Sequence, residues 1–129
     1  MTSSPPDVPS PRDSGDLLVS VRWRGPAAVV TVAGEIDLVT APELDEAVSG
    51  AVDDSPDVLV VDLRDVTFLS SAGLQVLAAA HQRLGEQSLR VVTTSNATSR
   101  PLTSTGLDTW IGLFPTVDEA LGGAAGTEA

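Results

Sequence analysis

Two adjacent serines stand where an apolar, strand-like segment changes into a helix-like one. Residues 58–63 read VLVVDL and residues 67–74 read TFLSSAGL, so Ser70 and Ser71 lie at this junction. A serine hydroxyl at such a place can cap the helix, attack a substrate or accept a phosphate. Each of these roles makes different demands on the neighbouring residues.

Capping needs nothing more than the junction, because a serine N-cap accepts a hydrogen bond from an unpaired N–H group of the first helical turn. Nucleophilic catalysis is excluded by distance. His81 is the single histidine and follows Ser71 by ten residues on the same predicted helix, which places it about 15 Å away along the axis. A general base must come within about 3 Å of its nucleophile. His81 falls in the apolar stripe of its helix, which predicts a packing role.

Phosphorylation is compatible with a helix N-terminus, where free N–H groups and the helix dipole favour an anion. A phosphoryl group still adds about two negative charges and bulk to an exposed position. If the fold tolerates this group but a docked partner does not, phosphorylation of the serine would switch binding off. Gly73 fits this role because its missing side chain lets a partner come close, although close packing of helix against strand explains a glycine equally well.

The composition excludes several classes of function. The chain has 129 residues, 42% of them hydrophobic, which suits a single domain. Its net charge of -11 disfavours binding to nucleic acids or anionic membranes. The absence of cysteine and the single histidine leave little for a metal site. No segment reaches the roughly 18 apolar residues of a membrane span, and no signal peptide is apparent, so we expect a cytoplasmic protein without metal or cofactor.

The strands that must position the serines follow from short β-branched runs. Residues 17–23 and 27–34 predict an opening β-hairpin, because Arg24, Gly25 and Pro26 between them are typical of a tight turn. Residues 57–63 predict a central strand, because they are apolar on both faces. Residues 89–95 predict a further strand.

The helices follow from apolar positions that share one face. They are predicted at residues 40–52, 73–84 and 98–105 and from residue 116 onward. Thr40 with Glu43, and Thr116 with Glu119, have the spacing of a capping box at two of these N-termini.

Strands interleaved with helices after a hairpin predict an α/β fold. We expect a mixed sheet of four to five strands with about four helices packed mainly on one side. Residues 17–122 form this domain. Residues 1–16, rich in proline, and residues 123–129 predict a flexible leader and tail.

Three segments together resemble the STAS domain of bacterial anti-sigma factor antagonists. They are residues 34–44 (GEIDLVTAPEL), residues 58–77 (VLVVDLRDVTFLSSAGLQVL) and residues 89–121, which begin LRVVTTSNATSR. In this family the unphosphorylated protein binds a kinase-type anti-sigma factor, and a sigma factor is thereby released. The anti-sigma factor in turn phosphorylates a serine at the start of the helix after the central strand, and a PP2C-type phosphatase removes the phosphate.

Carried over to this sequence, the resemblance implies that Ser71 is the phosphate acceptor. It also implies a docking surface of Asp37, Ser70, Ser71 and Gly73. Ser70 stands where the commoner family pattern has an aspartate. Loss of that carboxylate would ease addition of the phosphate, weaken recognition by the kinase, or make Ser70 an alternative acceptor.

The sequence therefore predicts a binding protein, not an enzyme, that acts as an anti-sigma factor antagonist. The alternative is a STAS docking module of a signalling scaffold that has no phosphorylation switch. An enzyme built on Asp37, Asp62 and Asp65 is disfavoured, because no metal-binding or acid–base spacing accompanies these carboxylates. Asp37 is also explained as a plain turn residue.

Overall fold

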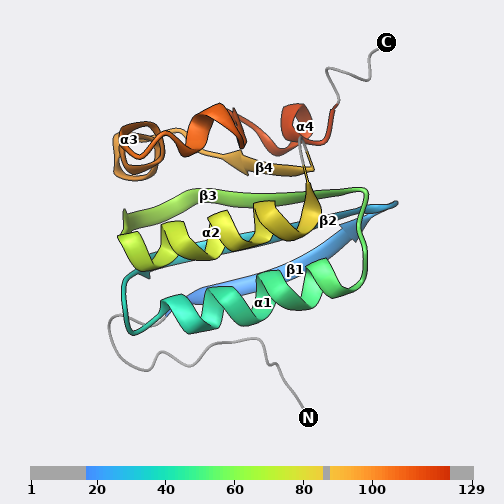
Figure 1. Cartoon of the computed structure of the whole chain (residues 1–129), viewed down its shortest axis with the longest axis horizontal. Helices are drawn as coiled ribbons and strands as arrows, with labels where there is room; N and C mark the ends of the chain where they lie inside the picture. The colour runs from blue at the N-terminus through green and yellow to red at the C-terminus, as the bar shows by residue number, and fades with distance from the viewer. Residues whose placement is uncertain (1–16, 86–87, 123–129) are drawn as a thin grey trace.

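The computed structural model of the chain describes residues 17–85 and 88–122. Five strands form one sheet in the order β1-β2-β3-β4-β5 (Figure 1). The strands are β1 (Leu18–Arg24), β2 (Ala27–Ile36), β3 (Val58–Leu69), β4 (Leu89–Val92) and β5 (Gly112–Phe114). The helices are α1 (Ala41–Asp53), α2 (Ser71–Leu84), α3 (Asn96–Ser104) and α4 (Val117–Ala120), with a 3-10 turn η1 (Leu107–Thr109). The predicted leader and tail, residues 1–16 and 123–129, lie outside the described residues.

The sheet opens with the predicted β-hairpin. β1 and β2 pair antiparallel as far as Arg24↔Ala27, so Gly25 and Pro26 alone form the turn. Gly25 has a φ of +62°, a left-handed conformation that other residues rarely adopt. β3, β4 and β5 each pair in parallel with the strand before them. The sheet is therefore mixed, as predicted, and has five strands.

The two faces of the sheet are covered unequally. α1, α2 and α3 pack on one face, and their apolar side chains share the main core with those of the strands. α4 covers part of the other face through Ala120, which packs with Val29, Val60 and Val92. The prediction of helices mainly on one side is confirmed. None of the helices in the described part of the chain is long and apolar enough to cross a membrane.

Several element boundaries differ from the prediction: β2 runs to Ile36 instead of residue 34, α3 begins at Asn96 instead of residue 98, and β5 was not predicted as a segment. β3 continues to Leu69 instead of ending at residue 63, because it pairs with β2 through two register shifts as far as Ile36↔Leu69. Such shifts break the alternation by which a strand is recognised in sequence. α2 begins at Ser71 instead of residue 73, and β4 ends at Val92 instead of residue 95. The longer β3 carries the chain directly to the two serines.

One carboxylate is buried on the sheet face that α4 covers in part. Asp62 is 5% exposed, and its Oδ1 accepts from the backbone N of Arg64 at 3.1 Å and from Nε at 3.0 Å, while Oδ2 accepts from Nη2 at 2.8 Å. Burial raises the pKa of Asp62, but the hydrogen bonds and charge of Arg64, with the charge of Arg22, outweigh burial and lower it below its ordinary value. Asp62 is therefore half of a structural ion pair.

We expect Asp62→Ala to lower the free energy of unfolding by about 1–3 kcal/mol, because a charge-assisted pair is lost from a buried position. The lowered pKa makes this contribution fully present above the unfolded-state value of about 3.9. The contribution is lost as the pH falls through the lower folded-state pKa. Urea denaturation at pH 7 and pH 3 measures both effects, with exposed Asp65→Ala as the control. Equal stability of the two variants at pH 7 would contradict the assignment.

Candidate functional site

The pairing of β2 with β3 brings two loops together at one edge of the sheet. Ile36 and Leu69 are partners at the ends of these strands, and Ser70 N donates to the carbonyl of Ile36 at 2.9 Å. The loop of residues 37–40 and the start of α2 therefore leave the sheet side by side, at the left in Figure 1. The structure thus gathers the predicted site residues Asp37, Ser70 and Ser71 at one place.

Asp37 organises the first of these loops. Its Oδ1 accepts from the backbone N–H groups of Val39 and Thr40, both at 2.9 Å, and Ala41 N donates to its carbonyl at 2.8 Å. This is the pattern of an Asx turn, which holds the loop directly before α1. The side chain of Thr40 makes no cap bond to α1; its hydroxyl donates to the carbonyl of Glu35 at 2.7 Å. The predicted capping box of Thr40 with Glu43 is therefore wrong, because the Thr40 hydroxyl also accepts from Asp37 N at 2.9 Å and is turned toward this loop instead of toward the first turn of α1.

We expect Asp37→Ala to lower the melting temperature, because the loop loses the acceptor that holds its N–H groups. Asp37→Asn keeps an acceptor oxygen and serves as the matched control. Hydrogen bonds from Thr40 and Val39 lower the pKa of Asp37. Its stabilisation is therefore present above the unfolded-state pKa of about 3.9 and is lost as the pH falls through the lower folded value. Thermal melts of both variants from pH 7 to pH 3 measure this, and a pH-independent difference would contradict it.

The two serines have different places in the structure. Ser70 is the N-cap of α2, is partly buried, and accepts a long hydrogen bond of 3.5 Å from Gly73 N. Ser71 is the first residue of the helix and is exposed. Among the described residues its hydroxyl has no hydrogen-bond partner, and the first turn of α2 contains no acidic residue. The capping role thus belongs to Ser70, and the Ser71 hydroxyl is accessible.

Gly73 is buried where α2 crosses the ends of β2 and β3. A Cβ atom at this position would lie 2.5 Å from Cγ2 of Ile36 and 2.7 Å from Cδ1 of Leu69, closer than real contacts allow. Close packing of helix against strands therefore accounts for this glycine. Gly73 therefore lets the N-terminus of α2, which carries the two serines, lie close to the sheet.

Exposed apolar side chains lie on the two segments that meet at the serines, and the sequence analysis missed them. Leu38 and Val39 are each 80% exposed in the loop after Asp37, and Phe68 is 50% exposed near the end of β3. Large exposed apolar side chains on neighbouring segments are typical of a protein interface. The sequence does hold a signal for the exposed loop, because an apolar pair stands between two turn-forming residues, Asp37 and Thr40.

No cluster of metal-binding side chains is found in the described part of the chain. That part contains no group of three or more His, Asp or Glu side chains placed to hold a metal ion. His81 is buried on α2 and packs edge-to-face against Trp110, with ring centroids 5.7 Å apart, in agreement with its predicted packing role. The carboxylate of Asp62 is occupied by Arg64. The arrangement fits a protein that binds another protein.

Comparison with known proteins identifies the family. The sequence profile of the STAS domain matches residues 19–120. The chain therefore belongs to the STAS domain family. A curated relative, the anti-sigma-F factor antagonist RsfB of Mycobacterium tuberculosis strain H37Rv, is 41% identical over 111 residues, which are 85% of this chain and 91% of the relative.

Solved structures agree with this assignment. The crystal structure of an anti-sigma factor antagonist from Mycobacterium paratuberculosis is 45% identical in sequence, with a TM-score of 0.78 over 83% of this chain and 92% of that one. The anti-sigma factor antagonist SpoIIAA in its unphosphorylated form gives a TM-score of 0.69 over 86% and 99% of the two chains. At 16% identity, that likeness concerns the fold alone. The family resemblance and the mixed α/β fold inferred from the sequence are both confirmed.

Proposed function

We propose that this chain is an anti-sigma factor antagonist whose unphosphorylated form binds a kinase-type anti-sigma factor and thereby releases a sigma factor. Phosphorylation of Ser71 ends the interaction, and a PP2C-type phosphatase restores it, in the cytoplasm. The names of the relatives at 41% and 45% identity support the antagonist role. The observation that best supports a phosphorylation switch at Ser71 is the different placement of the two serines, with Ser70 capping α2 and Ser71 exposed.

The fold can accept a phosphate on Ser71. The first turn of α2 has no acidic residue to compensate the helix dipole. A negative charge at such a position stabilises a helix by about 0.3–1 kcal/mol. The same charge would stand beside exposed Leu38 and Val39, where a docked partner would have to remove water from it. We therefore expect the domain to tolerate the phosphate and the phosphate to weaken binding of the partner.

Ser70 is the weaker candidate for the acceptor. Its hydroxyl oxygen already accepts from Gly73 N, and its backbone N–H donates to Ile36. A kinase would have to pull this partly buried residue out of the helix cap before it reached the hydroxyl. Asp37, Ser70 and Ser71 remain the proposed contact residues for the anti-sigma factor, with Gly73 supporting them from beneath.

Phosphopeptide mapping tests the proposal. The purified chain is incubated with ATP and with each kinase-type anti-sigma factor encoded in the same genome. Cleavage after Arg64 and Arg83 places Ser70 and Ser71 in one peptide, so fragmentation within that peptide must assign the site. We expect phosphate on Ser71 of the wild type and of Ser70→Ala, and none on Ser71→Ala. Binding without phosphorylation would favour a scaffold docking module, and phosphate on Ser70 would overturn the choice of acceptor.

A further inference from the structure

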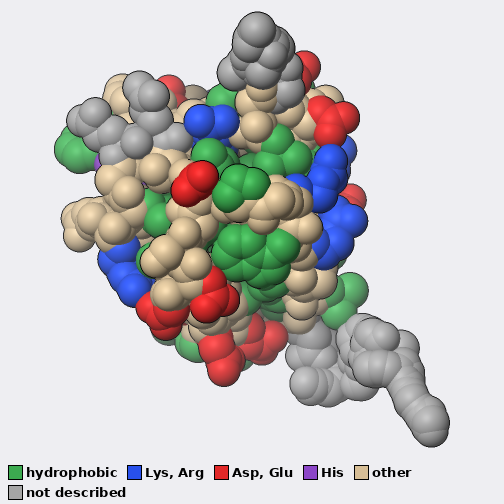
Figure 2. Space-filling model, turned by 90° about the vertical axis from the view of Figure 1, so that its right-hand side faces the viewer, with side chains coloured by type: hydrophobic (Ala, Val, Ile, Leu, Met, Phe, Trp, Pro, Cys, Tyr) green, Lys and Arg blue, Asp and Glu red, His purple; other side chains and the backbone are tan. Residues whose placement is uncertain are grey.

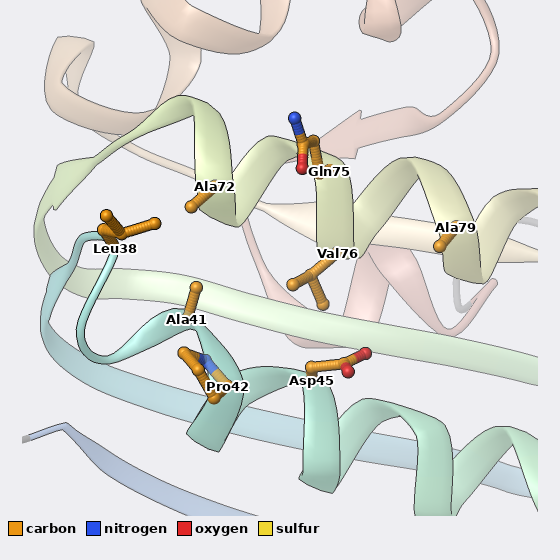
Figure 3. Close-up of a pocket in the computed structure, with 8 residues that line it drawn as sticks. All are labelled: Leu38, Ala41, Pro42, Asp45, Ala72, Gln75, Val76 and Ala79. Carbon is orange, nitrogen blue, oxygen red and sulfur yellow. The ribbon is translucent and has the colours of Figure 1, made fainter.

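A groove runs along the outer surface between α1 and α2, with a volume of about 370 Å³ at its wider end. Figure 3 shows Leu38, Ala41, Pro42 and Asp45 on one side of it, and Ala72, Gln75, Val76 and Ala79 on the other. A narrower hollow of about 20 Å³ shares Asp45, Val76 and Ala79 with it and extends as far as Arg83. The narrow hollow has room for about one water molecule, so the part of the groove that an occupant can enter runs from Leu38 to Ala79.

The groove is apolar because small side chains face one another across the two helices. Ala41 on α1 and Ala72 and Ala79 on α2 leave space above Val76 that larger residues would fill. From Ala72 to Ala79 the groove follows seven residues of α2, or about 10 Å at 1.5 Å per residue. About two turns of a further helix match this length, and a helix laid into an apolar groove is a common mode of recognition.

The two walls differ in charge. α1 presents the exposed acidic residues Glu43, Asp45, Glu46 and Asp53, whereas the exposed polar residues of α2 are Ser71, Gln75, Gln82 and Arg83. The acidic side chains visible in Figure 2 gather mostly at the lower edge, on the side of α1. Asp53 is paired with Arg83 at 2.6 Å, so its charge is already balanced. Asp45 forms no ion pair within the described residues, so it is the charge that an occupant would meet.

The groove begins at the candidate docking site. Leu38 directly follows Asp37, and Ala72 directly follows Ser71, and both line its open end. A helix lying in the groove would therefore reach the position of the switch. A phosphate on Ser71 would then act at the end of an interface that extends well beyond the serine.

We propose that the groove between α1 and α2 binds an amphipathic helix of the anti-sigma factor, with apolar side chains against Ala79 and Val76 and a lysine or arginine facing Asp45. This inference rests on the proposed function and adds the surface that supplies most of the contact area. The charge of Asp45 gives the helix its orientation, because only one wall of the groove is acidic.

Isothermal titration calorimetry with the purified anti-sigma factor tests the groove. Ala79→Trp fills it, and Gln82→Trp places the same side chain on α2 outside the lining. Asp45→Arg reverses the groove charge, and Glu46→Arg makes the same change in net charge one residue away. We expect the dissociation constant to rise more than about tenfold for Ala79→Trp and Asp45→Arg. The two controls should stay within about twofold of wild type, and thermal melts verify that all four variants fold.

The outcomes separate this inference from the proposed function. If the wild type and Ala79→Trp bind the anti-sigma factor with the same affinity, the groove is not the binding surface. The proposed antagonist role would still hold. If the wild type binds no anti-sigma factor, the proposed function fails, and the groove inference fails with it. Light scattering that shows a wild-type dimer lost in Ala79→Trp would assign the groove to a second copy and overturn the inference.

The chain's own N-terminal residues are the other occupant to be tested. The protein has no cysteine, so Thr2→Cys provides a single attachment point for a spin label. We expect the amide signals of Ala72, Gln75 and Ala79 to keep their intensity in the labelled chain. Broadening of these signals at low protein concentration would show that the N-terminal residues fill the groove and would overturn the proposal.

Discussion

Replacing Ser71 with aspartate is expected to weaken binding to the anti-sigma factor by more than about tenfold, or about 1.4 kcal/mol. Ser71 is exposed at the first position of α2, next to a loop that presents Leu38 and Val39. A partner that covers these apolar side chains would have to bury the new carboxylate without a counter-charge, which is costly. Calorimetric titration at one fixed salt concentration measures the change.

The domain itself should tolerate Ser71→Asp. An acidic residue in the first turn stabilises a helix by about 0.3–1 kcal/mol, and the first turn of α2 has none. We therefore expect unchanged or slightly raised stability in urea, so that lost binding does not reflect unfolding. Ser71→Ala should bind like the wild type, and Gln82→Glu adds a negative charge to the far end of the same helix as a control. Equal binding by Ser71→Asp and wild type would show that Ser71 is not a switch.

Much of the site was predictable because it depends on local sequence. The strand-like run before Ser70 and the apolar stripe after Ser71 place the serines at a strand-to-helix junction whatever the rest of the chain does. The position of Asp37 at the start of the loop after the second strand was implied by the family resemblance, and the structure has it directly after β2. The sequence did not reveal which serine caps α2, because serine suits the cap at either position and the choice depends on where β3 ends.

The remaining features depend on contacts between distant segments. β3 extends to Leu69 because β2 offers it partners as far as Ile36, and no local pattern records that pairing. Exposure of Leu38 and Phe68 likewise follows from how the loops leave the sheet. The groove between α1 and α2 exists because alanines on two separate helices face each other. In the sequence these alanines only form part of an apolar stripe, and such a stripe does not show whether the space between the helices is filled or open.

The second large effect is expected at Gly73, where alanine should lower the free energy of unfolding by about 1–3 kcal/mol. The added Cβ would meet Ile36 and Leu69, which are both buried at the ends of their strands. Alanine is otherwise favoured over glycine inside a helix by about 0.8–1 kcal/mol, so the sign of the change shows whether packing dominates. Urea denaturation measures it.

Gly50 provides the matched control, because it lies within α1 and a Cβ there would meet nothing within 4 Å. Gly50→Ala should raise the free energy of unfolding by up to about 1 kcal/mol, opposite in sign to Gly73→Ala. The strain at Gly73 should also move the N-terminus of α2 away from Ile36 and displace Ser70 and Ser71, so affinity for the anti-sigma factor should fall together with stability. A stabilised Gly73→Ala would mean that α2 does not lie this close to the strands. A destabilised variant that keeps full affinity would separate the packing role of Gly73 from the docking surface.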